Sequence, residues 1–156
     1  MATSSRQIRK HSRNSYDNYL AVHRSTLKKF SRYSTGHPSY DLLIRQDALS
    51  LRATFEVETQ RGKLIGISVV KVARITWHRG RKYCETVDYS YVAYDSATGR
   101  QQISYHSPHL NLVAKSKPHH RYHHKHLYLA DEVVFPLWDD EIPHVSDFLE
   151  EVIESF

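Results

Sequence analysis

Apolar positions near the C-terminus recur with the spacing of an α-helix. The pattern begins at Val145, and the positions that continue it at intervals of three and four residues are Phe148, Leu149, Val152, Ile153 and Phe156. This spacing places the side chains on one side of a helix, so the sequence predicts an amphipathic helix that begins near Pro143 and closes over one face of a sheet. Proline is tolerated in a first turn, and nearby carboxylates favour the positive end of the helix dipole.

The N-terminal part of the chain shows the same spacing more weakly. After Ser15, a good N-cap type, the positions that share one side are Tyr16, Tyr19, Leu20, His23, Leu27 and Phe30. We expect a helix that packs its tyrosines on the core, with basic residues on its other faces: Arg24, Lys28 and Lys29. Docking of this basic face on nucleic acid is the alternative role. Residues 1–14 are polar and basic without periodicity, which predicts a flexible arm.

Between the two helices the pattern changes to the period of two that is typical of strands. Residues 51–57 alternate cleanly between apolar and polar side chains. Residues 64–77 are rich in β-branched side chains but alternate less strictly, which indicates cover on both faces or a bulge near Gly66. Residues 83–94 and 101–106 complete four strands. Their connections are too short for crossover helices, so the sequence predicts an antiparallel meander.

These patterns together predict the fold class. In residues 83–94, simple alternation sets Val87 on the same face as Tyr89 and Tyr91, and residues 127–135 add a short edge strand. We therefore expect an α+β protein with a four- to five-stranded antiparallel sheet, packed by the C-terminal amphipathic helix and preceded by the basic N-terminal helix. Two parts are predicted: a basic arm and helix over residues 1–45, and a sheet domain with its C-terminal helix over residues 46–156.

Charge is distributed unevenly along the 156 residues. The formal net charge is +5 and the isoelectric point is near 9.3, which favours an anionic partner, with nucleic acid first. Residues 1–35 hold eight Lys or Arg against Asp17 alone, whereas the chain from Asp131 onward holds nine acids and no Lys or Arg. The two ends are expected to form a strongly dipolar surface if they lie apart, or to neutralise each other in part if they dock.

The remaining composition bears on where the protein works. Cys84 is the single cysteine, which excludes an intramolecular disulfide and a cysteine-rich zinc site and fits a reducing compartment. The first residues have no apolar core of a secretory signal, and no stretch approaches the roughly 18 apolar residues of a membrane span. The sequence thus predicts a soluble, cytoplasmic protein without a membrane partner.

Candidate chemistry gathers between His106 and His126. Seven of the twelve histidines fall in these 21 residues, next to Lys115, Lys117, Arg121 and Lys125. Histidine titrates near neutrality and therefore suits proton transfer, metal ligation or pH-dependent charge. In extended chain, His124 and His126 point to one side, and His123 and Lys125 to the other.

The C-terminal two-thirds of the chain, about residues 51–156, resembles the TumE-like family of toxins from bacterial toxin–antitoxin systems. The residues that carry the resemblance are Tyr89-Ser90-Tyr91, the turn ending at Gly99, Tyr105-His106-Ser107-Pro108-His109, His123-His124-Lys125-His126 and the helix from Val145. Where the family tends to show Asp-Asn before Pro-His, this chain has His106-Ser107. The resemblance implies a toxin role and a cognate antitoxin protein as partner.

The leading hypothesis is a metal-independent ribonuclease without a cofactor. RNA is favoured over DNA, because such cleavage needs a base near the 2′-hydroxyl and an acid at the leaving oxygen, which histidine supplies near pH 7. The candidate catalytic residues are His106, His109, His124 and His126. Arg121 and Lys125 are predicted to hold phosphate, and Tyr89, Tyr91 and Tyr122 to stack bases.

Three other interpretations stay open at this point. His124 and His126 could share a metal ion with His106 or His109, although the flanking cations oppose this and no metal-binding residue is assigned. A non-catalytic module could hold nucleic acid or an acidic partner through the basic arm and the histidine-rich loop. The histidines could also be structural, with His123, for instance, hydrogen-bonded inside the core.

Overall fold

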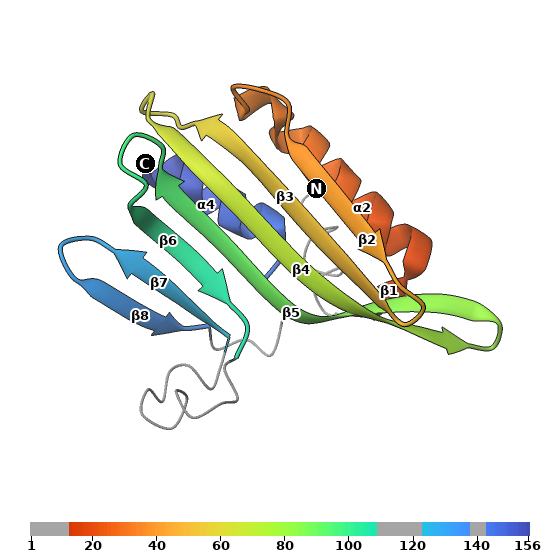
Figure 1. Cartoon of the computed structure of the whole chain (residues 1–156). Helices are drawn as coiled ribbons and strands as arrows, with labels where there is room; N and C mark the ends of the chain where they lie inside the picture. The colour runs from red at the N-terminus through yellow and green to blue at the C-terminus, as the bar shows by residue number, and fades with distance from the viewer. Residues whose placement is uncertain (1–12, 109–122, 138–142) are drawn as a thin grey trace, which may run out of the picture.

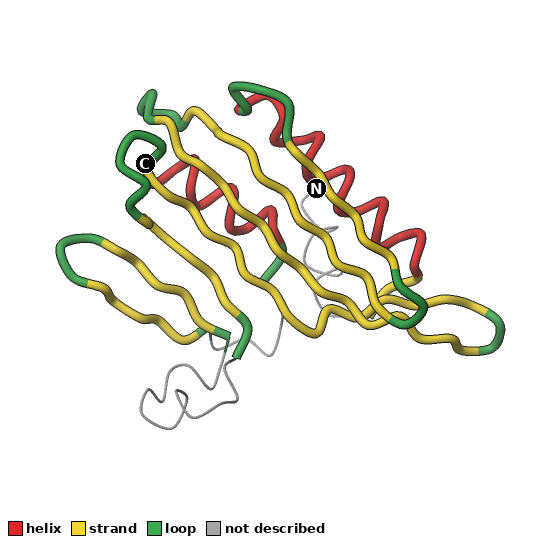
Figure 2. Tube along the Cα trace, in the orientation of Figure 1, coloured by secondary structure: helices red, strands yellow, loops and turns green. Residues whose placement is uncertain are grey.

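A computed structural model describes residues 13–108, 123–137 and 143–156. Two α-helices and eight strands appear in these residues (Figures 1 and 2). Their bounds in chain order are β1 Arg13–Ser15, α2 Tyr16–Phe30, the 3-10 turn Ser31–Tyr33, β2 Ser39–Ile44, β3 Ala48–Glu58, β4 Leu64–His78, β5 Arg81–Asp95, β6 Gln101–His106, β7 His124–Tyr128, β8 Glu132–Pro136 and α4 Val145–Ser155.

The strands form one antiparallel sheet in the order β2-β3-β4-β5-β6-β7-β8, and β1 pairs with β5 outside this path. Neighbours in the sheet are thus neighbours in the chain, as the predicted meander requires. Both helices lie on the same side of the sheet in Figure 1. The α+β class, the antiparallel sheet and the C-terminal helix are confirmed.

The prediction of four to five strands is too low, for a reason that lies in the sheet edges. β2 is six residues long and mostly exposed, and β1 has three residues, so neither shows enough alternation to be recognised. The segment expected as one edge strand over residues 127–135 is instead the hairpin of β7 and β8, with its turn between Tyr128 and Glu132. Short strands that bury one face only in part give weak periodic signals.

The hydrophobic core fills the space between the helices and the sheet. Its largest fully buried side chains include Tyr91, Phe148, Leu49, Leu51, Ile65 and Ile67. Phe148 of α4 contacts the rings of Tyr91 and Tyr105, with centroids 5.7 and 5.4 Å away. The apolar positions expected to face the sheet from the last helix, Val145 to Ile153, are buried, which confirms the pattern that predicted them.

Both helices begin with a side-chain cap. The Ser15 hydroxyl accepts a hydrogen bond from the backbone N–H of Asn18, as its N-cap type predicted. Arg13–Ser15 is a strand rather than part of a flexible arm; residues 1–12 lie outside the described chain. The last helix starts two residues after Pro143, because His144 takes the N-cap and forms a capping box with Asp147.

A bulge in β5 reverses which of its side chains face the core. The register between β4 and β5 shifts after Val72, so that Val72 pairs with Asp88 but Ala73 pairs with Thr86. Val87 is the extra residue; it is 45% exposed, whereas Cys84 and Thr86 before it and Tyr89 and Tyr91 after it are buried. The prediction that Val87 shares a face with Tyr89 and Tyr91 is therefore wrong, because one inserted residue changes the phase of a two-residue period.

Gly66 is not the site of a bulge, since β4 keeps its register with both neighbours there. Its role is to leave room for an aromatic ring. A Cβ at this position would lie 2.2 Å from the ring of Tyr94, its cross-strand partner on β5. Glycine in a strand interior often marks such a close approach.

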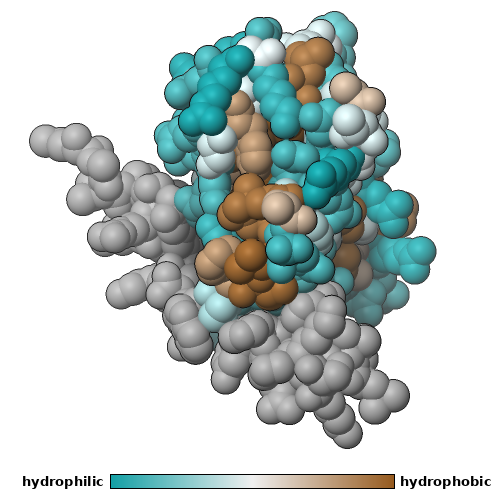
Figure 3. Space-filling model, turned by 90° about the vertical axis from the view of Figure 1, so that its left-hand side faces the viewer, coloured by the Kyte–Doolittle hydropathy of each residue, from teal (hydrophilic) through white to brown (hydrophobic). Residues whose placement is uncertain are grey.

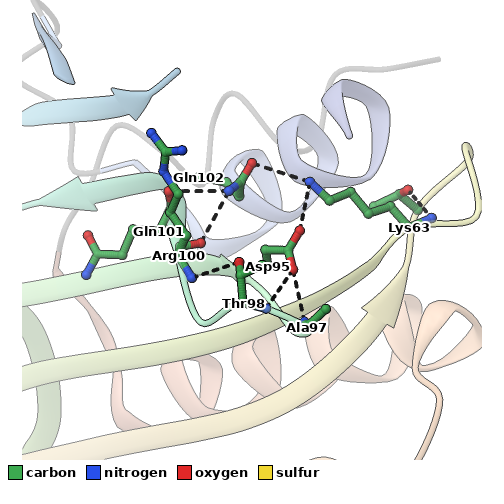
Figure 4. A network of polar contacts seen from close by, with 8 residues as sticks. Lys63, Asp95, Ala97, Thr98, Arg100, Gln101 and Gln102 are labelled. Carbon is green, nitrogen blue, oxygen red and sulfur yellow. Dashed lines mark hydrogen bonds and ion pairs between the residues drawn. The ribbon is translucent and has the colours of Figure 1, made fainter. Parts of the chain in front are cut away.

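A polar network fastens the turn between β5 and β6 to the start of β4 (Figure 4). The Asp95 carboxylate accepts hydrogen bonds from the backbone N–H groups of Ala97 and Thr98, and Lys63 lies 3.2 Å from its other oxygen. The hydrogen bond from Lys63 and those from the backbone lower the pKa of Asp95. Lys63 also reaches Gln102 of β6, so one cation links three strands.

The basic N-terminal and acidic C-terminal parts of the chain meet at the helices. Lys29 of α2 forms an ion pair with Glu150 of α4, with 2.7 Å between Nζ and the carboxylate oxygen. Lys125 of β7 pairs with Glu151 of the same helix at 2.8 Å. Of these two cations only Lys29 belongs to residues 1–35, so the ion pair between α2 and α4 is the one that joins the basic and acidic ends here.

Candidate functional site

Three histidines, one from β6 and two from β7, lie together on the sheet. β6 and β7 pair so that His106 stands directly opposite His124, and Ser104 stands opposite His126. The ring centroids are 5.7 Å apart for His106 and His124, 5.3 Å for His106 and His126, and 5.1 Å for His124 and His126. We call these three residues the histidine cluster. It joins three of the four predicted catalytic residues.

The cluster lies on the sheet face opposite the two helices. Side chains alternate along β7, and Lys125, between His124 and His126, points toward α4, where it pairs with Glu151. His124 is fully buried, His126 is 6% exposed and His106 is half-buried. Ser104, beside them on β6, is also fully buried. The imidazoles therefore sit in a largely desolvated setting, where a hydrogen bond or a charge acts more strongly than in water.

Hydroxyl groups surround His106. Its Nδ1 lies 3.2 Å from the Ser90 Oγ of β5, and its Nε2 lies 2.9 Å from the Ser104 Oγ. A hydroxyl can donate or accept a hydrogen bond, so the two serines satisfy either neutral tautomer of His106. The ring can thus exchange the position of its proton without leaving a nitrogen unsatisfied.

A carboxylate orients His126. Nδ1 of His126 lies 2.5 Å from Oε1 of Glu132, the first residue of β8. Because a carboxylate only accepts, Nδ1 carries the proton, and a neutral ring then presents Nε2 as a base. The Glu132 side chain is 44% exposed, so this pair connects the buried cluster with the surface. The Tyr128 ring stacks on the His126 ring with 5.8 Å between centroids, and burial raises the pKa of Tyr128.

Two predicted base-stacking residues lie on the opposite side of the sheet. Tyr89 and Tyr91 are 3% and 0% exposed, and their rings pack in the core beneath α4. Tyr89 also stacks on His123 and its hydroxyl lies 3.0 Å from Nδ1 of that ring. Burial raises the pKa of both tyrosines, which remain protonated phenols. The structure therefore does not bring them to the histidine cluster.

Lys125, predicted to hold phosphate, is also placed on the helix side. Besides its ion pair with Glu151, its ammonium lies over the rings of Tyr105 and Phe135, at 6.0 and 5.8 Å from their centroids. The expected opposition of His123 and Lys125 to His124 and His126 is confirmed by these contacts. Three other predicted site residues, His109, Arg121 and Tyr122, lie outside the described residues.

The arrangement bears on the metal interpretation as well. In residues 13–108, 123–137 and 143–156, no group of three or more His, Cys, Asp or Glu side chains is arranged to hold a metal ion. The three imidazoles contact one another through their rings, and two of them direct nitrogens at Ser90, Ser104 and Glu132.

Sequence reasoning missed the residues that hold the histidines in place. In the sequence, Ser90 stands out only as the middle of a Tyr-Ser-Tyr strand, and Ser104 only as one residue of a strand. A signal existed for Ser104, which lies two residues from His106 and therefore on the same face of β6. Glu132 carried no such signal, because its contact with His126 depends on the turn between β7 and β8.

Comparison with known proteins adds no further assignment. No helix within the described ranges has both the length and the apolar character needed to cross a bilayer. The chain finds no match among protein-family models, curated proteins or solved structures.

Proposed function

We propose that this protein is the toxin component of a toxin–antitoxin system, that it acts on RNA in the cytoplasm, and that the histidine cluster supplies the acid and the base for metal-independent cleavage. The observation that carries the proposal is the contact between His106 and His126, 5.3 Å between ring centroids, with Glu132 holding one of them. Paired imidazoles of this kind suit a reaction that removes one proton and delivers another.

The proposed reaction uses the RNA strand as its own nucleophile. Nε2 of His126 removes the proton of the 2′-hydroxyl, and the resulting oxygen attacks the adjacent phosphorus. The bond from phosphorus to the 5′-oxygen breaks, and protonated His106 gives that oxygen its proton, leaving a 2′,3′-cyclic phosphate. Glu132 is a positioning residue, because it touches His126 and stabilises the imidazolium that forms. His124 packs against both rings, with its centroid 5.7 Å from that of His106 and 5.1 Å from that of His126.

The resemblance to TumE-like toxins supports the biological role. Three of the segments that carry it contribute residues to one face of the sheet. The Tyr-Ser-Tyr segment contributes Ser90, the segment from Tyr105 contributes His106, and the segment from His123 contributes His124 and His126. A toxin needs a partner that neutralises it. We therefore expect a neighbouring gene to encode a small DNA-binding antitoxin whose coexpression restores growth.

The test is induced expression of the wild type and of the variants His106→Ala and His126→Ala in a bacterial host. Growth and RNA integrity are followed together, and thermal unfolding of each purified variant establishes that it is folded. We expect wild-type expression to arrest growth and to fragment RNA, and both variants to lose both effects. His37→Ala is the matched control, because His37 is exposed and lies outside the cluster. Full toxicity in both cluster variants contradicts the proposal.

A second candidate function is binding of nucleic acid or an acidic partner without chemistry. The complete burial of His124 favours it, because a fully buried imidazole suits a structural role better than contact with a substrate. In that case growth arrest would leave RNA intact, and alanine substitutions in the cluster would weaken binding gradually. The RNA integrity measurement separates the two functions.

A further inference from the structure

β4 and β5 extend past the rest of the sheet as a two-stranded ribbon. The pairing of β3 with β4 ends at Ala48 and Arg74, whereas β4 and β5 stay paired from Ile75–Cys84 to His78–Arg81. Figure 1 shows this hairpin projecting beyond the other strands at the lower right. We call residues 74–85 the basic ribbon.

The ribbon carries four cations and one acid. Arg74, Arg79, Arg81 and Lys82 are all exposed, and Glu85 is the acid. Trp77 stands among them with 63% of its surface exposed, the highest value for a large hydrophobic side chain in the described part of the chain. Its cross-strand partner Lys82 lies on the same face of the ribbon. An exposed indole ring beside an ammonium group matches a ligand that offers both aromatic faces and anionic groups.

The base of the ribbon is anchored to the rest of the protein. Ile75 and Cys84 are buried, β1 pairs with residues 83–85, and the backbone N–H of Ile75 donates to Asp47 O at 2.8 Å. The Lys82 ammonium lies 5.0 Å from the Trp77 ring centroid and 5.3 Å from that of Tyr16. Trp77 is therefore held in place on one side of the ribbon before any ligand arrives, which lowers the entropy lost on binding.

The turn at the tip holds an arginine where the backbone disfavours it. Arg79 has φ 49° and Gly80 has φ 74°, so both central residues of the two-residue turn are left-handed. Asparagine or glycine is the usual choice at the first of these positions, and an arginine there is strained. This strained arginine lies at the tip of the ribbon, where its guanidinium is accessible to an anionic ligand.

We propose that the basic ribbon binds single-stranded nucleic acid, with Trp77 stacking on a base and Arg79, Arg81 and Lys82 contacting phosphates. Base stacking on an aromatic ring beside phosphate-neutralising cations is the common mode for single strands. A membrane surface fits less well, because Trp77 is the one large exposed apolar side chain of the ribbon and the tip itself is Arg79-Gly80. An acidic protein would account for the cations and leave the exposed indole ring without a role.

The ribbon is a separate site from the histidine cluster. The proposal shares its class of ligand with the proposed function, but binding at the ribbon requires no cleavage. An RNA whose 2′-hydroxyls are methylated cannot act as its own nucleophile, so its affinity reports the ribbon alone. Loss of RNA cleavage therefore tests the histidine cluster, and loss of affinity for the methylated RNA tests the ribbon.

The experiment measures binding of a fluorescent, 2′-O-methylated single-stranded RNA to the full chain over a range of salt concentrations. We expect Trp77→Ala to weaken binding roughly tenfold or more. The combined variant Arg79→Asn, Arg81→Gln and Lys82→Gln is expected to reduce the slope of log affinity against log salt by about 0.7 for each phosphate that the protein no longer neutralises. Arg61→Gln, which removes one exposed cation at the opposite end of β4, is the control and is expected to leave both quantities unchanged.

Arg79→Asn alone gives the sharpest version of the test. Asparagine suits the left-handed position, so the variant is expected to unfold at the same temperature as the wild type or higher, while its affinity for RNA falls. The proposal would be overturned if Trp77→Ala and the combined variant both bound the RNA with the affinity of the wild type. The proposal would also be overturned if these variants kept the wild-type affinity for RNA but no longer bound vesicles of anionic lipid. That result would assign the ribbon to a membrane surface.

Discussion

Nζ of Lys71 lies 3.1 Å from Nε2 of His23 in the core between β4 and α2. Both side chains are 4% exposed. Nδ1 of His23 lies 2.7 Å from the carbonyl oxygen of Tyr19, which can only accept, so that nitrogen carries the proton and Nε2 accepts from Lys71. The Tyr19 ring lies 5.4 Å from the ammonium, and the His144 ring lies 5.7 Å from that of His23. A lysine and a neutral histidine thus share a nearly dry site.

Burial makes stability depend on pH at this site. It lowers the pKa of Lys71 from 10.5 to about 7, so between these values the unfolded chain binds more protons than the folded chain. Stability then rises with pH across that window, by a few kcal/mol at most. Burial and the Lys71 charge also lower the pKa of His23, so stability falls as the pH drops below about 6.5.

Replacement of the lysine removes the alkaline part of this dependence. We expect Lys71→Met, which roughly preserves volume, to lose the rise in unfolding free energy between pH 7 and 10, as measured by urea denaturation at several pH values. Lys28→Met removes a charge from the exposed side of α2 and should keep the wild-type slope. An unchanged slope in Lys71→Met would show that Lys71 stays protonated in the fold.

The pair of His126 and Glu132 gives a prediction about activity. Glu132→Gln keeps an acceptor for the His126 Nδ1–H but removes the charge that stabilises an imidazolium. We expect initial cleavage rates on RNA to fall about tenfold or more, with a smaller change in the substrate concentration at half-maximal rate. Glu58→Gln, at an exposed position on β3, is the control and should leave the rate unchanged. Equal rates in both variants would remove Glu132 from the proposed reaction.

The contact of Tyr94 with the Gly66 backbone gives a prediction about stability. We expect Gly66→Ala to lower the free energy of unfolding by about 1–3 kcal/mol, because the new methyl group would meet the Tyr94 ring. A double-mutant cycle with Tyr94→Leu tests the cause. If Gly66→Ala lowers the free energy of unfolding by the same amount in the Tyr94→Leu background, the Tyr94 ring is not the cause. The destabilisation would then arise in the strand backbone.

The β8 edge gives a prediction about self-association. Apolar side chains gather on the side of the molecule where β8 is the outermost strand in Figure 1, as Figure 3 shows. Val133 and Phe135 of this strand are 41% and 40% exposed. A charge on an edge strand opposes pairing with another chain, so Val133→Lys should reduce light scattering of concentrated protein. Leu129→Lys, in the adjacent turn, should reduce the scattering less. An equal reduction would show that the protein associates through exposed apolar area and not through pairing of the β8 edge.

The helices and the central strands could be predicted from the sequence because they bury a full periodic face. The spacing from Val145 to Ile153 and the N-cap at Ser15 correspond to the helices found. Simple alternation failed at Val87, since a bulge changes the phase without changing the composition of the strand. It also failed at the β1, β2 and β8 edges, where few residues are buried.

The histidine cluster could be predicted only within one strand. Alternation from His123 to His126 separated the two pairs correctly, because that rule is local. The pairing of His106 with His124 depends on the register of β6 and β7, and the contact of His126 with Glu132 depends on the next turn. Register across a long connection leaves no periodic trace in a sequence.

The sequential order of the strands has a consequence for how this chain reaches its fold. From β2 to β6, each strand meets its partner after a short turn, so these pairings close small loops and carry little entropic cost. The pairing of β1 with β5, across about seventy residues, is the distant one, and α4 joins last in the chain. Folding should therefore spread from the β4–β5 hairpin outward and run faster than in Greek-key sheets of equal size, with docking of β1 and α4 as the late step.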